Sequence, residues 1–146
     1  MQASNAPIRS FPDLQNHWAK EFVEALAALG LVSGLPNGTF APDRPLSRAE
    51  LAVLVVNAFN RPKERSAVTF RDVGTTFWGK SAIDRAYEMG FVNGFPDGTF
   101  RPGSQLLRAD AFLALVNGLD LISTWVTIGD LKPFFDDTSG LSLIHI

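Results

Sequence analysis

The sequence lacks several features that would assign it to a functional class at once. It contains no cysteine, which excludes disulfide bonds and thiolate metal sites. No apolar run approaches the ~18 residues that a membrane-spanning helix needs, and there is no cluster of lysine and arginine. The formal net charge is −2. We therefore expect no binding to nucleic acid and no membrane insertion by this segment.

Signatures of catalysis and of metal binding are also missing. The sequence has no P-loop, dinucleotide fingerprint or Gly-x-Ser-x-Gly motif, and its acidic residues are scattered. The two histidines, His17 and His145, are isolated, and the stretch "LPNGTFAPD" (35–43) lacks the alternating acids of an EF-hand. We predict a non-enzymatic protein that uses neither a metal nor a cofactor.

What the sequence does contain is an internal repeat. The stretches "GLPNGTFAPDRPLSRAE" (34–50) and "GFPDGTFRPGSQLLRAD" (94–110) are identical at nine of seventeen positions and lie sixty residues apart. The segments before them, 11–34 and 70–94, also align, with one extra residue in the second copy. Each unit consists of Phe-x-Asp, a tryptophan, a helix, a Gly-rich turn and a second helix. One such unit cannot bury its apolar faces alone, so we expect the units to pack on each other.

The first helix of each unit is predicted to be amphipathic, running in the first copy from about Trp18 to Leu29. Its apolar residues recur at helical spacing and should face the core, with the tryptophan at the start of the stripe packed there too. The two stripes consist of Trp18, Phe22, Ala25, Leu26 and Leu29, and of Trp78, Ala82, Ile83, Ala86 and Met89. The glycine after each stripe, Gly30 or Gly90, is expected to end the helix.

The second helix of each unit follows the turn and is apolar on nearly all sides. Ser47 and Glu50 have the spacing of a capping box, which Leu107 breaks in the second copy. Such apolar helices are predicted to be buried and to meet each other. Within the turns, Phe40 and Phe100 should anchor the loop from below. The aspartates of the Phe-x-Asp motifs, Asp13, Asp72 and Asp137, should cap the first helix or brace the turn.

These features divide the chain into segments. The predicted boundaries are a tail (1–10), a first unit (11–60), a linker (61–69), a second unit (70–119), a second linker (120–134) and the start of a third unit (135–146). The third unit opens with another Phe-x-Asp motif and then lacks the rest. An apolar face is therefore expected to be exposed where the third unit would pack.

The ordered set of motifs resembles the S-layer homology (SLH) family. Phe-x-Asp, the helix tryptophan, the "PDGTF" turn and the Arg-containing helix start all recur at a constant offset. This resemblance implies a mainly α fold of tandem helix–turn–helix repeats, which pack as a pseudo-threefold bundle with the third repeat incomplete. It also implies a cell-envelope anchor that binds a cell-wall polysaccharide, often one bearing a pyruvylated sugar, in grooves between repeats.

The resemblance further implies which residues bind the ligand. They are the arginines Arg48 and Arg108, the tryptophans Trp18 and Trp78, and the turn glycines Gly34, Gly38, Gly94 and Gly98. A guanidinium pairs with a carboxylate through two parallel hydrogen bonds, and free amides at a helix start also favour an anion. Aromatic faces can stack on sugar rings, and glycine allows a ligand to approach the backbone.

Two other interpretations remain open. The chain could be an assembly module that associates through exposed apolar helices, or a small hydrolase that acts on wall glycans. The N-terminal stretch "MQASNAPIRS" lacks the hydrophobic core of a signal peptide. Either the protein stays inside the cell, or, as a cell-surface location requires, the sequence is part of a longer protein.

Overall fold

The structure is a computed structural model that describes residues 10–121. It contains η1 (Pro12–Leu14), α1 (Lys20–Ala28), α2 (Arg48–Ala58), α3 (Lys80–Glu88) and α4 (Arg108–Gly118). Within this part of the chain, the only β pairing is one isolated bridge between Ser47 and Gln105. The predicted mainly α fold is confirmed. The predicted third unit, with Asp137 and His145, lies outside the described residues.

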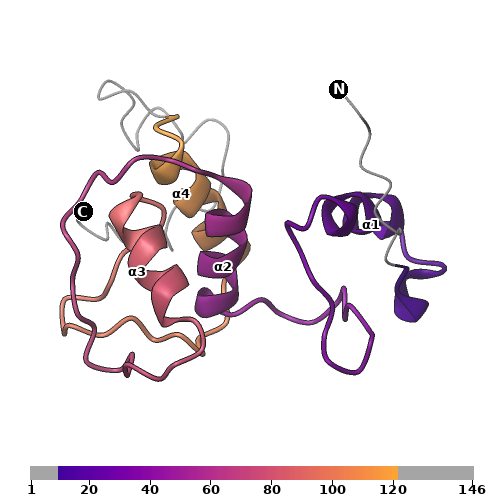
Figure 1. Ribbon diagram of the computed structural model, residues 1–146, viewed down its shortest axis with the longest axis horizontal. Coiled ribbons are helices and arrows are strands. Elements are labelled where there is room, and N and C mark those ends of the chain that lie inside the picture. Colours follow the sequence, from indigo (N-terminus) through magenta and orange to yellow (C-terminus); the bar gives the residue numbers. More distant parts are fainter. Residues whose placement is uncertain (1–9, 122–146) are drawn as a thin grey trace.

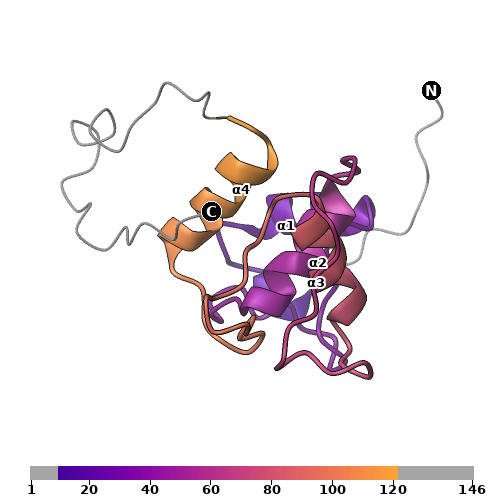
Figure 2. The same cartoon turned by 90° about the vertical axis from the view of Figure 1, so that its left-hand side faces the viewer.

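The second helix of the first unit packs with the second unit. Figure 1 shows α1 and its loop standing apart from α2, α3 and α4. Helix α2 packs chiefly against α3 rather than against α4, and Figure 2 shows the two side by side. The larger apolar cluster combines Ala52 and Val55 of α2 with Ile83 and Met89 around α3, whereas a smaller cluster around Phe11 and Leu14 holds the first unit. The larger cluster is therefore shared by the two units and centred on the second, and the first unit has a small cluster of its own.

Equivalent positions of α1 and α3 differ in burial. Ile83, Ala86 and Met89 are fully buried, as their stripe predicts. The corresponding prediction for α1 was wrong, because Trp18, Phe22, Ala25, Leu26 and Leu29 are all exposed. Periodicity identifies an apolar face but not what covers it, and no described helix packs on this face of α1. Core packing was also wrong for Trp78, which is 64% exposed.

The helix caps follow the sequence closely. Ser47 Oγ accepts a hydrogen bond from the Glu50 amide at 3.3 Å, and Glu50 Oε2 accepts one from the Ser47 amide at 2.8 Å, which confirms the capping box. Leu107 has no side-chain acceptor, but Asp110 Oδ2 still accepts from the Leu107 amide at 3.0 Å. Half of the box therefore persists at α4.

The Gly-rich loops of the two units have the same internal geometry. Asp13 accepts hydrogen bonds from the Phe40 and Ala41 amides, and Asp72 accepts them from the Phe100 and Arg101 amides, all between 2.6 and 3.1 Å. These bonds confirm that the aspartates brace the turn. They hold Ala41 and Arg101 at φ values of 58° and 59°, a left-handed conformation that is uncommon for residues other than glycine.

Two of the turn glycines have a packing role. A Cβ atom on Gly34 would lie 2.4 Å from the ring of Phe11, and one on Gly94 would lie 2.2 Å from the ring of Phe70. Each ring also contacts the turn phenylalanine of its own unit, with centroids 5.4 Å and 5.3 Å apart. The Phe-x-Asp motif thus holds its loop through both the ring and the carboxylate.

Candidate functional site

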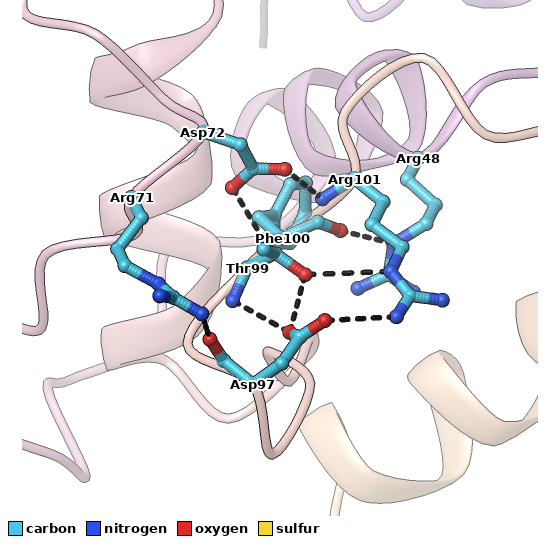
Figure 3. A network of polar contacts seen from close by, with 7 residues as sticks. All are labelled: Arg48, Arg71, Asp72, Asp97, Thr99, Phe100 and Arg101. Carbon is cyan, nitrogen blue, oxygen red and sulfur yellow. Dashed lines mark hydrogen bonds and ion pairs between the residues drawn. The ribbon is translucent and has the colours of Figure 1, made fainter.

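Arg48 starts α2 in the first unit, and its side chain enters the loop of the second. Its Nε donates a hydrogen bond to the Phe100 carbonyl at 2.8 Å, and its Nη2 donates to the Asn93 carbonyl at 2.6 Å. The guanidinium carbon lies 4.9 Å from the Phe95 ring centroid and 4.5 Å from that of Phe100. Figure 3 shows this arginine beside the loop. The backbone of the second unit therefore fixes the position of a cation from the first.

Backbone hydrogen bonds join the units at the same place. The Arg48 amide donates to the Ser104 carbonyl and the Ala49 amide to the Pro102 carbonyl, both at 3.0 Å. These are first-turn amides of α2, which have no acceptor within their own helix. The prediction that free amides beside Arg48 favour an anion is therefore wrong, because the second unit already satisfies them.

A second guanidinium lies against the same aromatic ring. The guanidinium carbon of Arg101 is 3.9 Å from the Phe95 ring centroid, and its Nη2 pairs with Asp97 Oδ2 at 3.0 Å. Arg48 and Arg101 lie close together on this side of the loop (Figure 3). The sequence comparison missed Arg101 because its counterpart is Ala41. The available signal was an arginine directly after "GTF" in one copy only.

The electrostatics of this cluster reflect two neighbouring cations. Burial lowers the pKa of Arg48, and the charge of Arg101 lowers it further, whereas Asp110 and Asp72 raise it. Hydrogen bonds from the Thr99 hydroxyl and amide, followed by Arg101, lower the pKa of Asp97 to about 2. An additional anion beside Arg48 and Arg101 would relieve their mutual repulsion.

Arg48 borders a small hollow between the units, with a volume of about 50 Å³. Asn93, Phe95, Asp110 and Asn117 also line it. Because one water molecule occupies roughly 10–15 Å³ on this measure, the hollow has room for a carboxylate group but not for a sugar ring. We call it the small hollow.

The first unit contains the counterpart of this hollow, with a volume of about 410 Å³. Every residue of the small hollow apart from Arg48 and Leu51 has an equivalent, sixty positions earlier, that lines this one. Arg48 and Leu51 come from the preceding unit, and no described residue takes their place here. We call it the large hollow.

The predicted site residues fall into separate groups. Arg48 and Gly94 line the small hollow, and Gly34 and Trp78 line the large one. Gly38 and Gly98 adopt φ values of 83° and 77° within their turns and line neither hollow. Trp18 is 82% exposed and lies against His17, with ring centroids 5.5 Å apart.

Arg108 does not share the surroundings of Arg48. It is exposed, and its guanidinium lies 5.6 Å from the ring centroid of Phe112 in its own helix. The predicted equivalence of the two arginines is therefore not found within residues 10–121. The physical reason is that Arg48 depends on the loop of the following unit for all its partners.

The described residues contain neither a cluster of metal-ligating side chains nor a helix that could span a membrane. Among residues 10–121, no three His, Asp or Glu side chains gather closely enough to hold a metal ion. None of the helices in this part of the chain has the length and apolar character needed to cross a bilayer.

Comparison with known proteins identifies the repeat. The family model of the S-layer homology domain matches residues 10–52 and 69–112. The chain is 35% identical over 134 residues to the surface-layer 125 kDa protein of Lysinibacillus sphaericus. The matched region covers 92% of the chain and 11% of that protein. It is also 32% identical over 115 residues to the cellulosome-anchoring protein of Acetivibrio thermocellus, and this match covers 74% of the chain and 25% of that protein.

Some relatives are enzymes of which the matched region is a small part. The chain is 31% identical over 102 residues to endo-1,4-beta-xylanase A of Thermoanaerobacterium saccharolyticum, covering 69% of the chain and 9% of the enzyme. In all three relatives the chain spans a quarter of the length or less. The surface-layer relatives confirm the predicted place in the cell envelope, and the two matched repeats confirm the predicted family. The chain belongs to the S-layer homology domain family.

Proposed function

We propose that this chain is a non-catalytic module that anchors a larger protein to the cell wall by binding an acidic wall polysaccharide. The observation that carries the proposal is the pair of guanidinium groups, Arg48 and Arg101, against one aromatic ring beside the small hollow. Two neighbouring cations favour an anionic ligand, and arginine pairs with carboxylates through geometrically matched hydrogen bonds.

The size of the small hollow specifies the part of the polysaccharide that enters. A carboxylate substituent, such as a pyruvyl ketal, fits a volume of about 50 Å³, whereas the sugar ring stays at the surface. Arg48 uses Nε and Nη2 for the second unit, which leaves Nη1 for the ligand. Arg101 supplies the second positive charge, and the half-exposed Phe95 ring offers an apolar surface to the sugar.

The remaining predicted site residues receive secondary roles. The exposed rings of Trp18 and Trp78 are available to stack on sugars of a longer chain. Gly34, Gly38, Gly94 and Gly98 shape the loops, so we propose that they act on binding through loop geometry. Arg108 is exposed at an equivalent helix start, and a ligand role for it stays a prediction.

The hydrolase interpretation has little support in either hollow. Glycosidases commonly use two carboxyl groups that flank the scissile bond. Among residues 10–121, Asp110 is the only acid that lines the small hollow, and Glu50 is the only one that lines the large hollow. Glu50 is held by Arg44 and by the Ser47 amide and hydroxyl. We therefore propose that any catalytic activity resides elsewhere in the full-length protein.

Co-sedimentation with purified cell-wall sacculi tests the proposal. Arg101→Ala should reduce the bound fraction several-fold without loss of fold, because Ala41 occupies the same left-handed position in the first unit. Arg48→Ala should reduce binding further, and Lys20→Ala, which removes a cation at the start of α1 that does not line the small hollow, should leave it unchanged. Equal binding by the wild type, Arg48→Ala and Arg101→Ala would refute a site at the small hollow.

A further inference from the structure

The segment that joins the two units, residues 61–69, packs along the end of α3. The Glu64 and Arg65 amides both donate hydrogen bonds to the Glu88 carbonyl, at 2.7 Å and 3.1 Å. The Lys63 ammonium pairs with the Glu88 carboxylate at 2.9 Å. Glu88 is the last residue of α3, and carbonyls in the last turn of a helix have no donor within their own helix. The linker therefore completes the end of α3, and this contact fixes the place of Arg65.

The Arg65 side chain reaches from the linker to Asn93. Its Nη1 donates a hydrogen bond to Asn93 Oδ1, and its Nη2 makes a longer one to the Gly90 carbonyl at 3.5 Å. The guanidinium carbon lies 5.3 Å from the ring centroid of Tyr87, within the range of a cation–π contact. Arg65 is half-buried, so these contacts hold a partly desolvated cation against Asn93.

This contact determines which end of the Asn93 amide is left for a ligand. A guanidinium only donates hydrogen bonds, so Asn93 must turn its oxygen towards Arg65. The remaining end of the amide is Nδ2, which carries two donor hydrogens. Among residues 10–121, nothing accepts a hydrogen bond from this nitrogen, and Asn93 lines the small hollow. The amide therefore has donors, and no free acceptor, to offer to a group in the hollow.

The backbone of Asn93 belongs to the same site. Its carbonyl accepts the 2.6 Å hydrogen bond from Arg48 Nη2, so one arginine holds the backbone of Asn93 and another holds its side chain. Asp110 also lines the small hollow, and its charge opposes an anionic ligand there. A further donor offsets that repulsion, whereas an Asn93 oxygen turned into the hollow would add to it.

We propose that Arg65 is a positioning residue of the wall-binding site, and that it orients the Asn93 amide so that Nδ2 donates to the ligand carboxylate in the small hollow. This role rests on the proposed function. The carboxylate would then receive hydrogen bonds from Arg48 Nη1 and Asn93 Nδ2. Arg65 itself does not line the hollow and acts only through Asn93.

Calorimetric titration of the full chain with the native wall polysaccharide, and with the same polymer after reduction of its carboxyl groups, tests this role. Arg65→Ala should lower the affinity for the native polymer about tenfold, the size of one hydrogen bond to a charged group. Its affinity for the reduced polymer should match that of the wild type, because no carboxylate is present to receive Nδ2. Arg65→Lys keeps a group that only donates and should restore part of the loss.

Lys63→Ala is the matched control. It removes a cation from the same linker and one contact with α3, but Lys63 does not touch Asn93, so the variant should bind both polymers like the wild type. Asn93→Ser, which introduces the residue found at the equivalent Ser33, should lose as much affinity for the native polymer as Arg65→Ala. The double variant should lose no more than either single variant.

The outcomes separate this role from the proposed function. Equal binding of the native and the reduced polymer by the wild type would overturn both. A wild type that prefers the native polymer would leave the proposed function standing. The positioning role alone would then be overturned by an Arg65→Ala variant that binds the native polymer as tightly, or that loses affinity for both polymers alike. Additive losses in the double variant would overturn it too.

Asn93→Asp carries the test if Arg65→Ala loses the wild-type urea midpoint. This variant keeps an acceptor for Arg65 and replaces Nδ2 by an oxygen, so the contact with the linker persists while the donor is lost. It should bind the native polymer at least about tenfold more weakly than the wild type. Unchanged affinity in Asn93→Asp would contradict the proposed donor.

Discussion

The first and second units carry the same loop in two different settings. In both, an aspartate braces two amides, a phenylalanine packs on a glycine, and a non-glycine residue adopts a left-handed conformation. The second unit also receives α2 and Arg48 from its predecessor, whereas no described residue enters the loop of the first unit as Arg48 enters that of the second. The loop geometry is thus a property of each unit, but the core and the charged hollow are properties of the junction.

The largest difference between the units should appear in core substitutions at equivalent positions. Met89 is fully buried, and Met89→Ala should lower the free energy of unfolding by about 2–5 kcal/mol. Leu29 is 72% exposed, so Leu29→Ala should change the free energy of unfolding by no more than about 0.5 kcal/mol. Urea denaturation of dilute protein measures both. Equal losses at the two sites would show that α1 is as deeply packed as α3.

The next effect concerns how each unit fills the space beside its second helix. A Cβ atom on Gly118 would lie 2.0 Å from the ring of Phe91, and the equivalent pair in the first unit is Ala58 and Leu31. Gly118→Ala should destabilise the protein by about 1–3 kcal/mol through overpacking, despite the better helix propensity of alanine.

A double-mutant cycle sharpens this prediction. Adding Phe91→Leu to Gly118→Ala recreates the pair found in the first unit, and should recover part of the lost stability. The free energies of unfolding of the two single variants and the double variant give the coupling. Strict additivity would contradict the proposed exchange of volume between the two positions.

A smaller loss of stability should result from glycine substitutions at equivalent positions of the two loops. Gly34→Ala and Gly94→Ala each place a methyl group against the ring of Phe11 or Phe70, so each should cost about 1–2 kcal/mol. Similar shifts of the urea midpoint in the two variants would support a packing role in both loops. Weakened wall binding with unchanged stability would instead indicate direct contact between these glycines and the ligand.

The smallest expected effect is a loss of stability in acid. The pKa of Asp97 is lowered from 3.8 to about 2, and those of Asp13, Asp72 and Glu50 are also lowered. Because the folded pKa lies below the unfolded one, this stabilisation is complete above about pH 4 and is lost as the pH falls towards 2. The urea midpoint measured against pH should decline over this window.

Asp97→Asn is the matched control for that decline. Asn37 already accepts hydrogen bonds from the amide and hydroxyl of Thr39, so the turn tolerates the amide. The variant keeps the turn but removes one titrating group and the pair with Arg101, so its decline should be shallower. An identical decline would assign the acid sensitivity to the other carboxylates whose pKa is lowered, namely Asp13, Asp72 and Glu50.

Local features of the fold were predictable from the sequence, whereas the partners of each face were not. The capping box depends on Ser47 and Glu50, which are three residues apart in the chain. The braced turns depend on the Phe-x-Asp motif, which the sequence repeats in both units. The burial of Trp18 and Leu29 depends on which helix packs on α1, and hydrophobic periodicity carries no information about that partner.

In the candidate site, too, the residue itself was predictable from the sequence but its contacts were not. The family resemblance identified Arg48, but its acceptors, Asn93 and Phe100, lie in the other unit and form a contact that spacing alone does not reveal. Arg101 was missed because a comparison of repeats emphasises identical positions, whereas Arg101 stands opposite an alanine. A position at which the two copies differ can therefore belong to the binding site as well as a position at which they are identical.

The central claim is that the small hollow recognises a carboxylate on the wall polysaccharide. Isothermal titration calorimetry with the native polysaccharide, and with the same polymer after chemical reduction of its carboxyl groups, tests this claim most directly. The wild type should lose about tenfold or more in affinity on reduction, which corresponds to at least one charge-assisted contact. A variant carrying both Arg48→Ala and Arg101→Ala should bind the two polymers equally weakly. Equal affinity of the wild type for the native and the reduced polymer would contradict the account.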